Sequence, residues 1–188
     1  MMKSIKKLFS RKNKSPKSIR TTTSESGSEA QGPCETDNEK VVRAYVQKLN
    51  DHDMDGAKEL IADGCVCIFT KADNMELEWT ELAAEMVRIY DAFPDFNFRF
   101  DSSIDERKSD GVVVWSDVVP NGHHTGKPYG FGPCPAIETS GKYAENSPET
   151  IYFHVNEQGK ISKKVIECSG DMSGPPGLYT QIGGFPLM

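Results

Sequence analysis

The nine residues AFPDFNFRF, 92–100, mark the point at which the hydrophobic pattern of the chain changes from helical to strand-like. Before this stretch, apolar residues recur every three or four positions, which predicts an amphipathic helix that starts at Thr80 and that Pro94 ends. After Pro94, every second residue is a phenylalanine, as in a half-buried strand. The residues that carry the two patterns are Leu82, Met86, Ile89, Tyr90 and Phe93, followed by Phe96, Phe98 and Phe100.

Two further helices are predicted upstream of this stretch. Thr36 stands three residues before Glu39, which is the spacing of a capping box, and the apolar residues that follow share one helical face up to Leu49. Asp53 can cap a second, shorter helix, and Gly64 stands where a left-handed residue would end it. The run CVCIFTK, 65–71, then reads as a strand.

Strands are predicted for most of the chain after the pattern changes. Three apolar runs have strand character, VVVWSDVV (112–119), TIYFHVN (150–156) and ISKKVIEC (161–168), and the last two are joined by a turn at EQGK. Gly and Pro interrupt residues 120–148, which predicts loops there. The order of elements predicts one α+β domain, residues 38–188, with helices on one face of a curved, mainly antiparallel sheet.

Residues 1–37 have a different composition, rich in Lys, Ser and Thr with few apolar residues, and are predicted to form a disordered tail. An organelle presequence and a basic segment that contacts anionic lipid stay open as alternatives. No apolar run has the length of a transmembrane span, so the expected location is cytoplasmic.

The charge distribution argues against a nucleic-acid partner. All eight basic residues of the tail precede Glu25, the first acid, so the rest of the chain carries 14 basic against 28 acidic residues. A phosphate backbone selects clustered Lys and Arg. The five cysteines are an odd number without a secretory signal, which favours free thiols in a reducing compartment. No metal is expected either, because the adjacent His123 and His124 point to opposite sides of an extended chain.

Five short motifs in order resemble the SnoaL-like polyketide cyclases, which belong to the nuclear transport factor two-like superfamily. They are AFPDFNF (92–98), HHTGKPYG (123–130), TSGK (139–142), NEQGKI (156–161) and GLYTQIGGFP (177–186). The resemblance covers about residues 38–188 and implies a cone-shaped α+β fold with a deep pocket for a small apolar, often aromatic, molecule. It implies acid–base chemistry that forms an enolate and closes a ring by an intramolecular aldol step, without a metal or redox cofactor. The same superfamily contains non-catalytic ligand-binding and dimerisation modules, so a silent module and a homodimer stay open.

Three residues are the candidates for proton transfer. His154 alternates with Tyr152 on the more polar face of its strand, and imidazole titrates near neutral pH; the alternative is a histidine facing solvent. Asp117 is expected among core side chains, which would raise its pKa, unless the strand frays there. The resemblance places His124 at the pocket mouth, and the alternative is a loop histidine bonded to backbone. The residues expected to contact a substrate are Trp79, Tyr90, Trp115, Tyr152 and, at the rim, Asp171.

Overall fold

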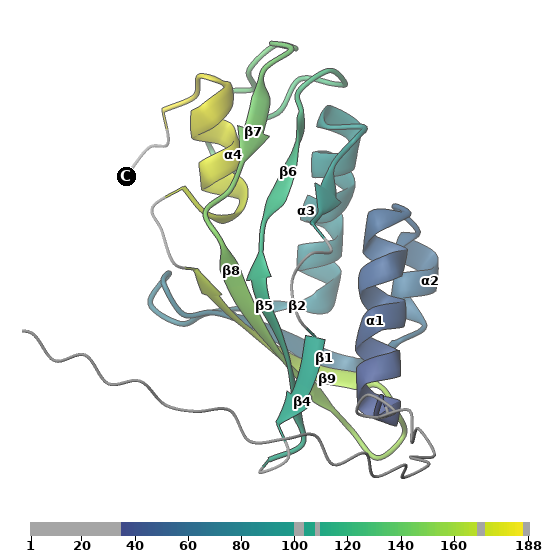
Figure 1. The fold of residues 1–188 in the computed structure, drawn as a ribbon. Coiled ribbons are helices and arrows are strands. Elements are labelled where there is room, and N and C mark those ends of the chain that lie inside the picture. Colours follow the sequence, from purple (N-terminus) through teal and green to yellow (C-terminus); the bar gives the residue numbers. More distant parts are fainter. Residues whose placement is uncertain (1–34, 100–103, 108–109, 169–171, 186–188) are drawn as a thin grey trace, which may run out of the picture. The chain divides into compact units, whose positions relative to one another are not determined.

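The computed structural model describes residues 35–99, 104–107, 110–168 and 172–185. From Glu35 onward the chain forms one compact unit of α-helices and β-strands, drawn in Figure 1. Helices α1 and α3 lie against a curved sheet in which antiparallel pairs dominate, so the predicted α+β fold class is confirmed. The predicted tail lies outside the described residues up to residue 34.

Helix α1 spans Asp37–Asn50 and begins with the predicted capping box. The Glu39 N–H donates to Thr36 Oγ1 at 3.1 Å, and the Thr36 N–H donates to Glu39 Oε2 at 2.8 Å. These two bonds satisfy N–H groups that the first turn of a helix leaves without partners. The apolar face of α1 is buried through Val42, Tyr45, Val46 and Leu49.

Helix α2, Met54–Lys58, is a single short turn whose N-cap is Asp53, as predicted. Gly64 does adopt a left-handed conformation, with φ of 72°, but it does not end this helix. It lies inside strand β1, Ile61–Phe69, at a point where the pairing register shifts between Ile61 and Val66. The sequence signal for a left-handed residue was right, and the element to which it was assigned was wrong.

Helix α3, Trp79–Ala92, follows strand β2, Met75–Glu78, and ends just before Pro94 as predicted. It buries Met86, Ile89 and Tyr90. The strand that follows is short, β3 at Asn97–Phe98, with Phe96 and Phe98 buried. Phe100, the third phenylalanine of the predicted alternation, lies outside the described residues.

The main sheet has the strand order β2-β1-β9-β8-β5-β4. Its remaining strands are β4, Ile104–Arg107; β5, Val112–Val118; β8, Glu149–Val155; and β9, Ile161–Cys168. The pair β1 and β9 is parallel and the other pairs are antiparallel. Side chains of β1, β5, β8 and β9 on the helix side therefore face one shared core.

A second sheet and a fourth helix were not predicted. Strands β6, Pro120–His123, and β7, Tyr143–Glu145, join β3 in a three-stranded sheet. Helix α4, Gly174–Ile182, lies beside β7 near the top of Figure 1 and buries Leu178, Tyr179 and Ile182. Its first turn contains Pro175 and Pro176, which signal a loop in sequence but also suit the first positions of a helix.

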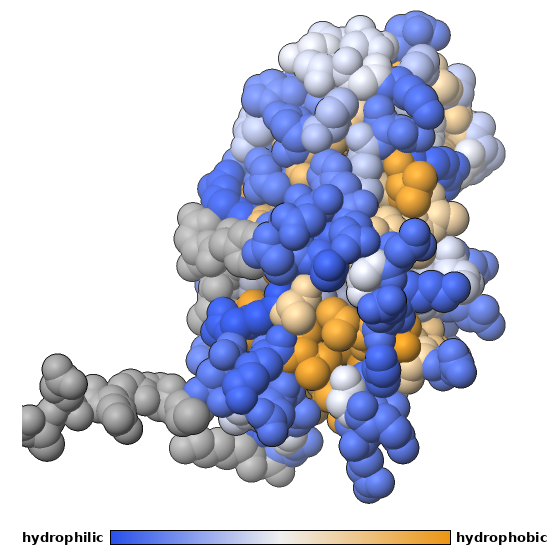
Figure 2. Space-filling model, turned by 90° about the vertical axis from the view of Figure 1, so that its right-hand side faces the viewer, coloured by the Kyte–Doolittle hydropathy of each residue, from blue (hydrophilic) through white to orange (hydrophobic). Residues whose placement is uncertain are grey.

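The helices expose their polar sides. Figure 2 shows the side of the molecule that lies on the right of Figure 1, where hydrophilic side chains cover most of the surface and a smaller hydrophobic group lies between them. None of the described helices is both long and apolar enough to cross a membrane.

Candidate active site

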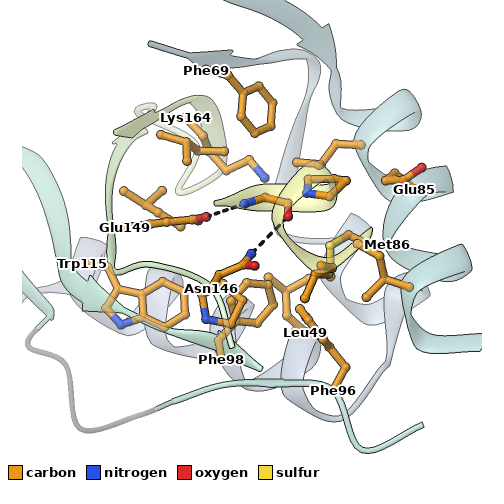
Figure 3. Close-up of a pocket in the computed structure, with 18 of the residues that line it drawn as sticks. Leu49, Phe69, Glu85, Met86, Phe96, Phe98, Trp115, Asn146, Glu149 and Lys164 are labelled. Carbon is orange, nitrogen blue, oxygen red and sulfur yellow. Dashed lines mark hydrogen bonds between the residues drawn. The ribbon is translucent and has the colours of Figure 1, made fainter. Parts of the chain in front are cut away.

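A cavity lies between α1, α3 and α4 on one side and the main sheet on the other, with an empty volume of about 690 Å³ including its opening. Most of its wall is apolar, with aromatic rings from Phe69, Phe96, Phe98, Trp115 and Phe153. Five polar or ionisable side chains interrupt this wall: Tyr45, Glu85, Asn146, Glu149 and Lys164. They come from α1, α3, β8, β9 and the loop after β7, so only the folded chain brings them together. Figure 3 labels four of them, Glu85, Asn146, Glu149 and Lys164.

Glu149 is the first residue of β8 and shares the inner face of that strand with Ile151 and Phe153. It is 7% exposed, and its Oε1 accepts a hydrogen bond from the Gly174 N–H at 3.1 Å. Burial disfavours the carboxylate and raises the pKa of Glu149 to about 7, although the bond from Gly174 acts in the opposite direction. Glu149 can therefore both release and accept a proton near neutral pH.

Asn146 follows β7 and lies beside Glu149 in the cavity wall. Its Nδ2 donates to the carbonyl oxygen of Gly174 at 3.2 Å. Glu149 and Asn146 thus hold the two backbone polar groups of Gly174, the residue at which α4 begins (Figure 3).

Lys164 comes from β9 and is 3% exposed. Its Nζ donates to Tyr45 Oη at 2.8 Å and lies 4.7 Å from the centre of the Trp79 ring. Burial alone would lower the pKa of Lys164, but Tyr45 and Cys67 more than offset this, so its pKa is raised. The cavity wall therefore carries an ammonium group as well as a carboxyl group that titrates near neutrality.

Glu85 is the ionisable group that α3 contributes. Its Oε1 accepts a hydrogen bond from Tyr129 Oη at 2.7 Å, and its Oε2 pairs with Arg88. Because both carboxyl oxygens already have strong partners, the geometry favours a structural role for Glu85 over proton transfer.

His154 was expected to face the cavity, and the structure places it on the opposite face of β8 from Glu149, Ile151 and Phe153. Burial, with Lys163 nearby, lowers its pKa. The polar face of β8 was expected to line the cavity. In the folded chain the apolar face lines the cavity, and this corrects the expected position of His154.

Asp117 was expected among core side chains, and it is exposed. The pairing of β5 with β8 shifts register between Trp115 and Val118, and Asp117 has φ of 55°. This is a β-bulge, which adds a residue and breaks the alternation on which the expectation rested. Trp115 and Val118 both stay fully buried while Asp117 turns outward.

His124 is fully buried in the loop after β6 and does not line the cavity. Its Nδ1 accepts from the Ser140 N–H at 3.3 Å, and its Nε2 lies 3.1 Å from the carbonyl oxygen of Lys127. The alternative of a loop histidine bonded to backbone therefore describes its geometry. His123 instead pairs with Asp95 through Nδ1 at 2.7 Å.

The residues expected to contact a substrate are dispersed. Trp115 lines the cavity, whereas Trp79 does not, and the Trp79 ring packs against the Lys164 ammonium. Tyr90 donates its hydroxyl to the carbonyl oxygen of Leu49 at 2.8 Å and stacks on His52, so it belongs to the core. Tyr152 lies on the outer face of β8 and donates to Glu167 at 2.9 Å. Asp171 lies outside the described residues.

Sequence reasoning missed Glu149, Asn146 and Lys164 as cavity residues. Two sequence signals were available. If the predicted strand is extended by one residue, Glu149 lies on the same face as Ile151 and Phe153. Lys164 is two residues before Ile166 and therefore shares its face of β9. No sequence pattern marked Asn146, which a loop brings to the cavity. Among the described residues, no group of three His, Cys, Asp or Glu side chains is arranged to hold a metal ion.

Comparison with known proteins agrees with this architecture. The model of the SnoaL-like polyketide cyclase family matches residues 39–168. No curated protein matches the chain closely in sequence. Among solved structures, AclR from Streptomyces galilaeus is similar with a TM-score of 0.59 and 16% identity, over 78% of this chain and 80% of that one.

Two fungal proteins also share the fold. AusH from Aspergillus nidulans has a TM-score of 0.54 and 12% identity over 78% of this chain and 92% of its own. The pinacolase BvnE from Penicillium brevicompactum has a TM-score of 0.53 and 14% identity over 72% of this chain and 87% of its own. At these identities the likeness is one of fold.

Proposed function

This chain belongs to the SnoaL-like polyketide cyclase family, and on that premise we propose that it is an enzyme that moves protons on a small apolar carbonyl compound held in the cavity. The observation that carries the proposal is Glu149, an almost fully buried carboxyl group in an apolar wall whose pKa is raised to about 7. A group that titrates near the working pH is the most effective general acid or base.

The other half of the proposed chemistry is stabilisation of negative charge. Removing a proton beside a carbonyl group places charge on the carbonyl oxygen, and a fixed donor in a dry site stabilises that charge. Lys164 supplies such a donor, because Tyr45 Oη at 2.8 Å and the nearby Trp79 ring hold its ammonium in place. Glu149 and Lys164 lie on the same side of neighbouring strands, and the aromatic rings elsewhere in the cavity wall suit a flat hydrocarbon skeleton.

In the proposed reaction the Glu149 carboxylate takes a proton from the carbon beside the carbonyl group. The electron pair of the broken C–H bond stays on the substrate and places negative charge on the carbonyl oxygen near Lys164. Return of the proton to another atom gives an isomerisation. Attack of the enolate carbon on a second carbonyl of the same compound gives the ring closure that the family name describes, and the alkoxide that forms there takes the proton back from Glu149. Both outcomes conserve all atoms and need only side chains of this chain.

Exchange of hydrogen for deuterium tests the proposal without knowledge of the natural substrate. The probe is 2-tetralone, an apolar ketone with exchangeable hydrogens beside its carbonyl group, followed in deuterium oxide by proton NMR. We expect the protein to speed this exchange and Glu149→Gln to reduce the gain by about a hundredfold, the usual contribution of general acid–base catalysis. The matched control is Glu167→Gln, which changes an exposed carboxylate on β9. The proposal fails if Glu149→Gln exchanges as fast as the control.

A further inference from the structure

Hydrogen bonding in the cavity wall is incomplete at Asn146. The side chain is 3% exposed, and its Nδ2 donates to the carbonyl oxygen of Gly174, which fixes the orientation of the amide. The other amide atom, Oδ1, is buried without a hydrogen-bond partner among the described residues. A buried acceptor without a partner destabilises the fold, so a donor from outside the chain would stabilise it.

The backbone around Asn146 cannot supply that donor. Pro120 and Pro175, which line the same part of the cavity, have no N–H group. The Gly174 N–H is donated to Glu149, and the Gly177 N–H is donated to the carbonyl oxygen of Ser173 at 3.2 Å. Gly177 packs closely against the acceptor without offering it a side-chain donor, since an added Cβ there would lie 2.9 Å from Asn146 Oδ1.

We infer that the compound bound in this cavity carries a hydroxyl group and donates its hydrogen to Asn146 Oδ1. The inference rests on the proposed function, in that it takes the cavity to be the binding site. Asn146 and Glu149 hold the carbonyl and the N–H of the same residue, Gly174, so the hydroxyl lies at the end of the cavity where proton transfer is proposed.

The apolar wall favours a neutral donor. An ammonium group on the ligand would lose its hydration in a cavity whose wall is mostly apolar and already holds the Lys164 ammonium, and desolvating a charge costs far more than desolvating an O–H group. A phenol, an enol or an alcohol supplies an O–H without a charge. The substrate class is therefore an apolar carbonyl compound with a hydroxyl group near the carbon that loses its proton.

The test compares two flat ligands of similar size, 2-naphthol, which has an O–H donor, and 2-fluoronaphthalene, which has none. Calorimetric titration of the full-length protein should give a Kd about tenfold lower for 2-naphthol than for 2-fluoronaphthalene. A tenfold difference in Kd corresponds to about 1.4 kcal/mol, which is what one buried hydrogen bond contributes. In Asn146→Leu the preference should fall to about twofold, with the affinity for 2-fluoronaphthalene unchanged. Asn146→Ala serves as a second variant if the leucine variant does not fold.

The outcomes separate this inference from the proposed function. Equal affinity for the two ligands in the wild type, or a tenfold preference that survives in a folded Asn146 variant, overturns the hydroxyl inference and leaves the cavity as a binding site. Failure of both ligands to bind overturns the inference together with the proposal that the cavity holds flat apolar compounds.

Discussion

Glu149 accepts a hydrogen bond from the N–H of Gly174 at 3.1 Å, so the buried acid of the cavity is tied to the first residue of α4. The partner is a backbone group and carries no full charge. The bond therefore offsets burial only in part, and the pKa of Glu149 stays raised to about 7. An ion pair in the same place would have kept the carboxylate charged at neutral pH and removed the acid.

The pH dependence of stability follows from this raised pKa. The folded chain binds the Glu149 proton more tightly than the unfolded chain, so this stabilisation is present in full below the ordinary glutamate pKa of 4.5 and is lost as the pH rises through about 7. Glu149→Gln keeps a neutral acceptor at every pH. Urea unfolding from pH 4.5 to 8 should show the wild type losing about 3 kcal/mol relative to this variant. A parallel pH dependence in the two proteins would contradict the raised pKa.

Lys164 should matter more for activity than for stability. Replacing Lys164 by Met removes the desolvation cost of a buried ammonium but also takes away the 2.8 Å partner of Tyr45 Oη, and these two effects oppose each other. We expect Lys164→Met to unfold within about 1 kcal/mol of the wild type and to lose at least about tenfold in ketone exchange. Lys163→Met, which changes the preceding residue outside the cavity, is the control and should retain full activity. A Lys164→Met protein with wild-type exchange would remove Lys164 from the mechanism.

The positive φ in the bulge at Asp117 predicts which substitutions this position tolerates. Asp117 has φ of 55° and an exposed side chain, so glycine should be accepted without loss of stability. Valine at the same position should cost about 1–3 kcal/mol, because a β-branched residue is strained there. Neither change should alter exchange activity. If Asp117→Val unfolds like the wild type, the alternation of β5 is not interrupted as described.

Sequence reasoning was most successful where a local pattern decides the structure. The Thr36 and Glu39 capping box, the apolar face of α3 and the stop at Pro94 all depend on neighbouring residues, and each was predicted. The inner face of a strand depends instead on which side the helices cover. The alternation of side chains along β8 separates two faces of the strand. Only the packing of the folded chain shows that Glu149, Ile151 and Phe153 lie on the inner face.

Two other features depend on tertiary structure in the same way. The sequence around the bulge in β5 is typical of a regular strand. No local signal indicates that Asp117 departs from the regular alternation. Asn146 becomes a cavity residue because β7 pairs with β6 and brings the following loop beside α4. The site was therefore harder to predict than the fold, since its polar groups lie on segments that meet only after folding.

The proposed mechanism assigns proton transfer to Glu149, inside the cavity, and gives no part in it to His154, on the other face of β8. Measuring ketone exchange for Glu149→Gln and His154→Gln in parallel separates the two residues. Both changes replace a titratable side chain on the same strand by a neutral amide. We predict a loss of about a hundredfold for Glu149→Gln and a rate within about twofold of the wild type for His154→Gln. Full activity in Glu149→Gln together with a large loss in His154→Gln would contradict it.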